Sequence, residues 1–244
     1  MTGPLLAPHD PFVSSLEEAL QAPGAGHFLG TDANGRDILS LILYSARISL
    51  AVSFCVVLCC LFLGTTLGFI AGFFGGPLDR LFLFTADVFQ AFPGILLAIT
   101  VAAFIPQSLI NMILLLSFVG WVSYARLIRA GVLSLKSRDY ILAATVLGLP
   151  KSRILWRHVF PNLAGPVIVQ ASFGMAGVIL AESALSFLGL GLPAGTPSLG
   201  KLMDQGVNLL LVAPYVSIFP GAVIMFFVLS FNFVGDSLRE KFDV

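Results

Sequence analysis

The stretch ISLAVSFCVVLCCLFLGTTLGFIAGFFGGPL, residues 48–78, contains no Asp, Glu, Lys or Arg. Two later stretches, residues 88–125 and 205–235, lack these four residue types as well. A helix crosses the hydrocarbon core of a bilayer with about 20 consecutive, mostly apolar residues. Each stretch is long enough, so the sequence predicts an all-α, polytopic membrane protein that folds as a helical bundle.

Composition points to the bilayer as the solvent of this chain. Only 11% of its residues are charged, against about 25% in soluble domains, and 57% are hydrophobic. The 13 basic and 13 acidic residues balance, which argues against a nucleic-acid partner and leaves lipid as the expected surrounding. Cys55, Cys59 and Cys60 lie inside the first apolar stretch and are expected to pack as small hydrophobic side chains.

Five membrane spans are predicted, at residues 47–74, 80–104, 108–130, 163–188 and 213–235. An odd number of spans places the two termini on opposite sides of the membrane. If the loop between the third and fourth spans is cytoplasmic, most basic residues lie inside, as the positive-inside rule requires. We therefore expect a multi-pass protein of the cell membrane with its N-terminus outside and its C-terminus in the cytoplasm. The basic residues expected outside are Arg36, Arg47 and Lys201, and those expected inside are Arg80, Arg126, Arg129, Lys136, Arg138, Lys151, Arg153, Arg157, Arg239 and Lys241.

The chain is expected to divide into an extracytoplasmic cap, residues 1–46, a transmembrane domain, residues 47–235, and a cytoplasmic tail, residues 236–244. The cap is too polar to span and contains turn-forming residues before an amphipathic lead-in to the first span. Its start has no basic segment followed by an apolar one, so no cleavable signal peptide is expected. Residues 189–212, rich in Gly and Pro, predict a second outer loop at the membrane surface.

The loop between the third and fourth spans, residues 131–162, has a pattern that predicts two short helices, at residues 140–147 and 152–159. Gly148 is placed to end the first helix, Ser152 to cap the start of the second, and Pro161 to end it. We expect this loop to project from the membrane as a compact knob rich in Arg and Lys.

Four motifs resemble the inner-membrane permease subunits of ATP-binding-cassette importers for dipeptides, oligopeptides and nickel. The first is LGTDANGRD, residues 29–37, with ARISL, residues 46–50. The second, in the predicted knob, is DYILAATVLG, residues 139–148, with RHVFPN, residues 157–162. The others are ESALSFLGLG, residues 182–191, and NFVGDSLR, residues 232–239. Their order is that of the family, and they cover nearly the whole chain.

The resemblance implies a permease that catalyses no reaction itself and transmits the action of separate ATPase subunits. The expected partners are a second, homologous permease, two ATPase subunits and an extracytoplasmic substrate-binding protein, with the translocation path between the two permeases. The sequence has no Gly-rich phosphate-binding loop, and we expect neither a cofactor nor a metal. Peptide is the first cargo that the resemblance suggests, and nickel is the second.

The same resemblance assigns coupling to the ATPase to residues of the knob. Gly148 would permit a tight turn and a close backbone approach. His158 is expected to form hydrogen bonds at a helix end rather than to bind a metal, because no second type of ligand lies near it in the sequence. The residues assigned in this way are Asp139, Ala143, Ala144, Gly148, Arg157, His158, Pro161 and Asn162.

Three departures from the family pattern limit the resemblance. Leu142 stands where relatives have Glu before the paired alanines, and Leu199 stands where they have Trp in Pro-Ser-Trp-Gly. Relatives also begin with an additional span directly before the segment that corresponds to residues 4–11. We therefore expect the first span of the family to be missing from the chain as given.

Two acidic residues lie within predicted spans, where ionisable groups are costly and are candidates for a function. Asp87 precedes Phe92-Pro93-Gly94, which is expected to kink or break the second span. It either lines the translocation path or has a structural role. Glu182 is near the outer end of the fourth span. It either lines the translocation path or has a structural role, which is the expected one, by reaching the interface or by pairing with Arg36 or Arg47.

Gly64, Gly68 and Gly72 recur on one face of the first span, a spacing that lets helices approach closely. The neighbour is either another helix of this chain or a second permease. Two other classes of function are alternatives. An autonomous secondary transporter or channel would carry coupling-ion residues and often internal repeats, and an intramembrane enzyme would carry paired polar catalytic residues. Neither alternative explains the predicted knob.

Overall fold

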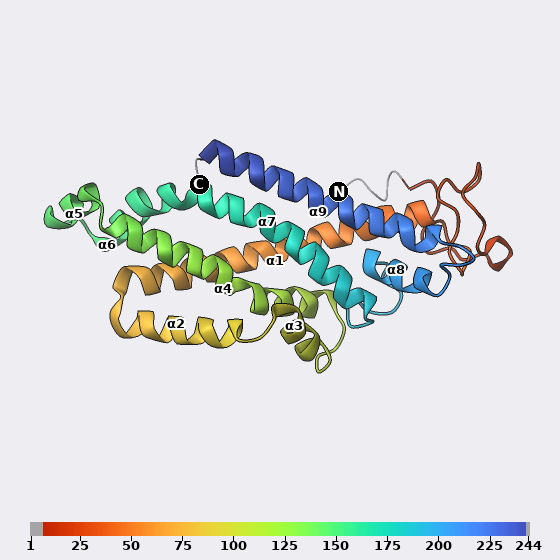
Figure 1. Ribbon diagram of the computed structural model, residues 1–244, viewed down its shortest axis with the longest axis horizontal. Coiled ribbons are helices and arrows are strands. Elements are labelled where there is room, and N and C mark those ends of the chain that lie inside the picture. The colour runs from red at the N-terminus through yellow and green to blue at the C-terminus, as the bar shows by residue number, and fades with distance from the viewer. Residues whose placement is uncertain (1–6, 243–244) are drawn as a thin grey trace. The chain divides into compact units, whose positions relative to one another are not determined.

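Nine α-helices follow one another along the computed structural model, which describes residues 7–242 (Figure 1). A short 3-10 turn at Leu16–Glu18 precedes them. The helices are α1 (Ile38–Phe74), α2 (Gly76–Gln90), α3 (Gly94–Ala102), α4 (Leu109–Lys136), α5 (Asp139–Val146), α6 (Lys151–Ile154), α7 (Phe160–Phe187), α8 (Leu199–Val207) and α9 (Tyr215–Phe242).

The predicted all-α membrane bundle is confirmed. Within residues 7–242, four helical stretches are long and apolar enough to cross a membrane: α1, α4, Lys151–Phe187 and α9. Helices α2 and α3 together form a fifth candidate, bent by 78° at the break between them. Pro93 lies in that break, and a proline disfavours helical geometry in the residue before it. The expected break of the second span at residues 92–94 is therefore confirmed.

The helices extend beyond the predicted spans. Helix α1 begins at Ile38, α4 continues to Lys136, and α9 continues to Phe242 through most of the predicted tail. An α-helix satisfies its backbone groups internally, so it does not have to end where the apolar stretch ends. Residues 1–6 of the predicted cap and residues 243–244 of the tail lie outside the described residues. The expectations for a signal peptide and for the first span of the family lie outside them as well.

The chain divides into two compact units. Unit 1 comprises the described residues up to Cys55 together with Ala98–Leu116 and Met175–Ser230. Unit 2 comprises Val56–Leu97, Ser117–Gly174 and the described residues from Phe231 onward. Unit 1 therefore holds most of the predicted cap and the predicted second outer loop, and unit 2 holds the predicted knob.

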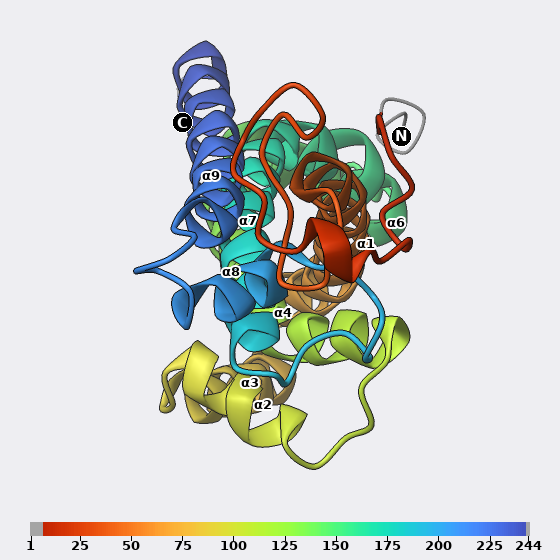
Figure 2. The ribbon, with the colours of Figure 1, turned by 90° about the vertical axis from the view of Figure 1, so that its right-hand side faces the viewer.

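In unit 1, α8 packs directly on the backbones of α7 and α9, as Figure 2 shows. A side chain at Gly200 would meet the backbone carbonyl of Ser183 on α7, and one at Gly206 would lie 2.5 Å from the backbone nitrogen of Ser217 on α9. Ser198 caps α8, because its hydroxyl accepts a 3.2 Å hydrogen bond from the Lys201 backbone nitrogen. The predicted second outer loop thus contains a packed helix.

In unit 2, the glycine pattern of α1 faces α4. A Cβ atom at Gly64 would lie 2.5 Å from the Tyr124 Cβ, one at Gly68 would meet the Ala125 carbonyl oxygen, and one at Gly72 would lie 3.0 Å from the Arg129 carbonyl oxygen. The pattern therefore brings α1 and α4 of the same chain into close contact. The neighbour of these glycines is thus a helix of this chain and not a second permease.

Candidate functional site

The α5–α6 segment, residues 137–162, is anchored to unit 2 by one face of its helices. Ile141, Ala144, Ile154 and Val159 are buried in a cluster with residues of α4 and α7. Ala143 and Leu142, next to the buried Ala144, are exposed on the opposite side. Of the paired alanines, Ala144 is therefore a core residue, and only Ala143 is available to a partner.

Gly148 ends the turn after α5 in the left-handed conformation, with a φ of +74°. Its amide donates to the Thr145 carbonyl (3.0 Å), and the Leu149 amide donates to the Ala144 carbonyl (3.2 Å), which closes the end of the helix. The predicted C-terminal cap at Gly148 is thus confirmed. A Cβ atom there would meet nothing within 4 Å, so no close contact within this chain requires a glycine. The left-handed backbone conformation of the turn is what favours glycine at this position.

The second helix of this segment differs from the prediction at both ends. Pro150 precedes its first residue, Lys151, so the prediction of Ser152 as the N-cap is wrong. A proline fits that place because it has no amide hydrogen to leave unpaired and its φ is already fixed near the helical value.

Pro161 does not end the helix, and that prediction is also wrong. It lies in the first turn of α7, after a π-helical turn at Leu155–Val159. A proline ring clashes with the carbonyl of the residue four positions earlier, here Arg157, and cannot donate to it. The wider π turn accommodates both effects, so the helix continues. Asn162 Nδ2 donates to the His158 carbonyl at 2.6 Å.

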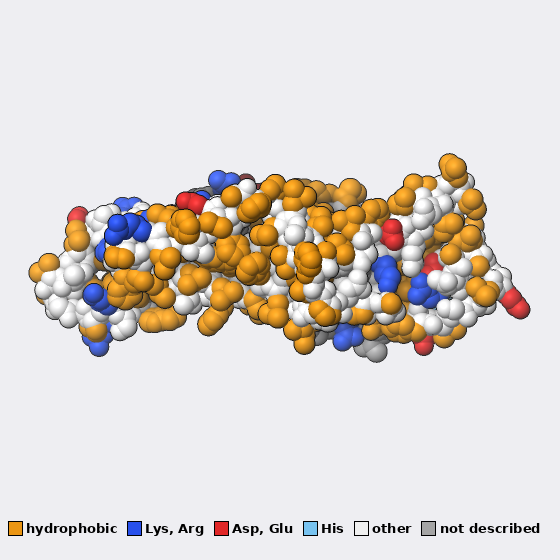
Figure 3. Space-filling view, turned by 90° about the horizontal axis from the view of Figure 1, so that it is seen from below, with side chains coloured by type: hydrophobic (Ala, Val, Ile, Leu, Met, Phe, Trp, Pro, Cys, Tyr) orange, Lys and Arg blue, Asp and Glu red, His pale blue; other side chains and the backbone are white. Residues whose placement is uncertain are grey.

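The outer surface of the α5–α6 segment combines apolar and basic side chains. Leu142, Val146, Leu147 and Trp156 are all at least half exposed, and Val146 reaches 87%. Asp139 and Arg157 are exposed, and the His158 ring is half-buried, 6.5 Å from that of Tyr140. Lys and Arg gather over the end of unit 2 that carries α5 and α6 (Figure 3). The segment thus presents a surface suited to a protein with apolar and acidic groups.

Asp87 pairs with Arg126 of α4 at 2.5 Å, and both side chains are exposed. Asp79, in the first turn of α2, forms a bidentate pair with Arg129 of α4. Arg129 Nη2 lies 2.7 Å from Asp79 Oδ2. These two side chains are about four-fifths buried, at 20% and 21% exposure. Sequence reasoning singled out Asp87 and missed Asp79, because Asp79 lies just before the predicted second span.

Glu182 is completely buried in unit 1. Its carboxylate accepts hydrogen bonds from the hydroxyls of Ser49 on α1 and Ser186 on α7, both at 2.8 Å. The expectation that Glu182 reaches the interface or pairs with Arg36 is wrong, because Glu182 is buried with serine partners and Arg36 binds Asp32 at 2.6 Å. One partner of Glu182 is therefore Ser49 of the ARISL motif, residues 46–50, which the sequence did not indicate.

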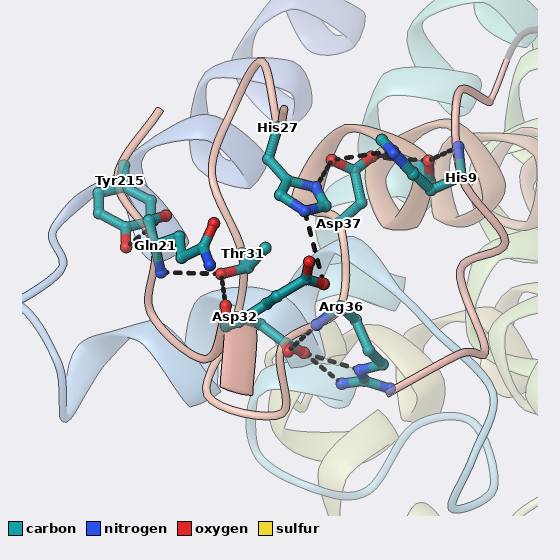
Figure 4. Close-up of polar contacts among 10 residues, drawn as sticks. His9, Gln21, His27, Thr31, Asp32, Arg36, Asp37 and Tyr215 are labelled. Carbon is teal, nitrogen blue, oxygen red and sulfur yellow. Dashed lines mark hydrogen bonds and ion pairs between the residues drawn. The ribbon is translucent and has the colours of Figure 1, made fainter. Parts of the chain in front are cut away.

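The LGTDANGRD motif, residues 29–37, builds a polar network in the predicted cap (Figure 4). Asp32 accepts hydrogen bonds from the backbone nitrogens of Asn34 (2.8 Å) and Arg36 (2.9 Å) and binds the Arg36 guanidinium. Thr31 donates to the carbonyl of Glu18 and accepts from the Gln21 backbone nitrogen. The motif therefore folds the cap onto itself before α1 begins.

Asp37 caps the start of α1. Its Oδ2 accepts hydrogen bonds from the Ser40 backbone nitrogen (2.8 Å) and hydroxyl (2.7 Å), and its Oδ1 lies 3.0 Å from His27 Nδ1. Burial by itself raises the pKa of the Asp37 carboxyl, but the hydrogen bonds from Ser40 and His27 and the charge of His9 outweigh burial and hold the pKa below its usual value. Sequence reasoning did not single out this group.

The family model described as "Binding-protein-dependent transport system inner membrane component" matches residues 64–243. The chain belongs to this family. The match includes α2 to α9 and therefore the whole α5–α6 segment. The resemblance drawn from the four motifs is thus confirmed at the level of the family.

Curated relatives of this family member cover almost all of its length. The dipeptide transport system permease protein of Alkalihalophilus pseudofirmus is 42% identical over 98% of this chain and 79% of the relative. The oligopeptide transport system permease protein of Bacillus subtilis is 35% identical, over 98% of this chain and 79% of the relative. The glutathione transport system permease protein of Pectobacterium atrosepticum is 39% identical, over 91% of this chain and 74% of the relative.

A solved structure shares the fold. It is an inward facing conformation of the MetNI methionine ABC transporter, with a TM-score of 0.66 and 16% sequence identity, and the match covers 83% of this chain and 96% of that chain. The likeness shows that this family member shares its fold with that chain.

Proposed function

We propose that this permease is the membrane-spanning subunit of an ATP-driven importer of short peptides, and that the α5–α6 segment transmits the motion of a cytoplasmic ATPase to the spans. Membership of the family of binding-protein-dependent transport components carries the proposal. Relatives over most of the chain are named for dipeptide, oligopeptide and glutathione transport, and these cargoes are all short peptides. ATP hydrolysis would then take place in separate subunits.

Two features of the α5–α6 segment support a docking role. Its apolar side chains are divided between a buried face, which fixes it to unit 2, and an exposed face, which leaves Leu142, Val146 and Leu147 without a neighbour to cover them. Exposed apolar groups of this size are typical of protein interaction sites. Leu142 replaces the glutamate expected there, so we propose that this contact with the ATPase is apolar rather than ionic.

The distribution of charge supports the proposed orientation. The α5–α6 segment would lie in the cytoplasm, where its basic residues satisfy the positive-inside rule, and the cap would lie outside, where a substrate-binding protein delivers cargo. A second, homologous permease and two ATPase subunits would complete the importer. For Glu182 and Asp87 we propose structural roles, because Glu182 is buried among serines and the charge of Asp87 is paired with Arg126.

Gly148→Asp tests the coupling role. It places a charged side chain at a left-handed position on the exposed turn, and we expect loss of peptide uptake although the chain still reaches the membrane. Gly195→Asp is the matched control, because Gly195 also has a positive φ, +89°, and open space around it, but belongs to unit 1. The control variant should transport normally.

The measurement is peptide uptake in the native host, with tagged chain extracted in mild detergent and its partners identified by mass spectrometry. We expect two ATPases, a second permease and a binding protein with the wild type and with Gly195→Asp. Wild-type uptake by Gly148→Asp in a normally assembled complex would contradict the docking role. Recovery of the wild-type chain without partners would favour the alternative of an autonomous transporter.

A further inference from the structure

Two histidines and an aspartate meet in the predicted cap although they come from three separate segments. His9 lies in the first described segment, His27 in the loop before the LGTDANGRD motif, and Asp37 at the start of α1 (Figure 4). One ligand atom of each side chain, a ring nitrogen or a carboxylate oxygen, lies within 4.8 Å of those of the other two. Neutral imidazole and carboxylate are the donors that divalent first-row metals such as Zn²⁺ use in proteins.

The distances between the ligand atoms are close to those of a metal site. His27 Nδ1 is 3.0 Å and His9 Nδ1 is 3.8 Å from Asp37 Oδ1. Tetrahedral Zn²⁺ with bonds near 2.0–2.2 Å holds its ligand atoms about 3.3 Å apart. The two separations lie on either side of that value. The His9 side chain is 46% exposed, so its ring has room to close the remaining gap to His27.

The surroundings position these side chains as the partners of metal ligands usually do. Asp37 Oδ2 is held by two hydrogen bonds from Ser40, which leaves Oδ1 directed at the histidines. The His9 backbone nitrogen donates to the Ser40 hydroxyl at 3.2 Å, which fixes the segment that carries His9. His27 Nε2 lies 3.8 Å from Glu18 Oε2, which is beyond hydrogen-bond distance but places a carboxylate near the far nitrogen of the ring; a carboxylate that hydrogen-bonds this nitrogen sets the tautomer of a ligating histidine.

We propose that His9, His27 and Asp37 form a binding site for a divalent transition metal, represented by Zn²⁺, with Asp37 Oδ1 and one nitrogen of each ring as ligands and a fourth position open to water. The ion would take the place of the direct contact between His27 Nδ1 and Asp37 Oδ1, with both rings neutral and the carboxylate ionised. It joins the segment around His9 and the loop around His27 to the first turn of α1. The bound ion would therefore stabilise the folded cap by cross-linking these segments.

Zn²⁺ binding to the purified full-length chain tests the proposal, and it does not depend on the proposed transport function. The chain is purified with a tag that contains no histidine, and Zn²⁺ is titrated calorimetrically. We expect one Zn²⁺ per chain. The variants are His9→Gln and His27→Gln, and His158→Gln is the control, because the sequence contains three histidines and His158 lies on the α5–α6 segment.

We expect the affinity for Zn²⁺ to fall by about tenfold or more in His9→Gln and in His27→Gln, since even the partners of metal ligands contribute 10- to 100-fold. His158→Gln should bind as the wild type does. Zn²⁺ should also raise the melting temperature of the wild type and of His158→Gln, but not that of His9→Gln, because a ligand that binds only the folded state stabilises it. If His27→Gln does not fold, His9→Gln carries the test, because that side chain is half exposed.

Co²⁺ distinguishes this site from the cysteines of α1. Thiolate ligands give bound Co²⁺ an intense charge-transfer absorption that imidazole and carboxylate do not give. A Co²⁺ spectrum without that absorption, lost in His9→Gln, supports the site. The proposal is overturned if the wild type binds no Zn²⁺, if His9→Gln binds it with unchanged affinity, or if His158→Gln loses it equally.

Discussion

Ser49 on α1 donates a 2.8 Å hydrogen bond from its hydroxyl to the Glu182 carboxylate on α7, and both side chains are completely buried within unit 1. Ser186 donates to the other oxygen of the same carboxylate at 2.8 Å. The acid therefore joins two helices through residues that are 133 positions apart in the sequence. Removal of the carboxylate would leave both buried hydroxyls without an acceptor, and a buried polar group without a partner costs free energy.

Glu182→Ala should lower the melting temperature of the chain in detergent. It removes the acceptor of two buried hydroxyls, each of which then costs about 1–3 kcal/mol. Glu182→Gln is the control, because its amide oxygen still accepts from one serine hydroxyl and its NH2 group can donate to the other, and it should remain close to the wild type. Equal stability of the alanine variant and the wild type would contradict the structural role of Glu182.

Gly68→Ala should also destabilise the chain. The added methyl group would meet the Ala125 carbonyl oxygen and lie 2.9 Å from the Ile128 Cβ, so α1 and α4 would have to separate, at about 1–3 kcal/mol. Gly177→Ala makes the same change on α7 at a position with nothing within 4 Å. It should be neutral or stabilise the helix by up to about 1 kcal/mol. The melting temperature should fall in Gly68→Ala and should stay the same or rise in Gly177→Ala. An equal decrease in both variants would contradict the close contact between α1 and α4.

The two ion pairs between α2 and α4 should differ in importance. Asp79 and Arg129 are mostly buried and bidentate, whereas Asp87 and Arg126 are exposed. Charge-assisted, bidentate pairs are the stronger kind, and exposed pairs contribute about 0–1 kcal/mol. We expect Asp79→Asn to lower the melting temperature more than Asp87→Asn does. A larger decrease for Asp87→Asn than for Asp79→Asn would contradict this ranking of the two pairs.

Asp37 should make the stability of the cap depend on pH in the acid range. Its pKa lies below the usual 3.8 in the folded chain, so ionised Asp37 stabilises the fold above that value, and this contribution disappears as the pH falls through the lowered pKa. The difference in melting temperature between the wild type and Asp37→Asn should be largest above about pH 5 and shrink below about pH 4. Glu17→Gln, which removes an exposed carboxyl from the same segment, should not show this pattern. A difference that stays constant with pH would contradict the role of the charge.

Local features of the chain were predicted correctly from the sequence. Charge-free stretches fix the membrane helices, because the bilayer tolerates few other arrangements of so many apolar residues. Pro93 predicts the break between α2 and α3, and Gly148 predicts the end of α5, because each acts on the backbone of its immediate neighbours. Pro161 failed as a signal of helix termination, because a π turn absorbs the clash that a regular helix would not.

The sequence by itself therefore determined the spans, their breaks and the family. Tertiary structure alone decided which side chains meet: Ser49 with Glu182, Asp79 with Arg129, and His9 with His27 and Asp37. These partners are separated along the chain by loops and whole helices, and neither periodicity nor spacing encodes the packing that brings them together. It also decided that the glycines of α1 face α4, because a pattern of small residues predicts close contact but does not identify the neighbour.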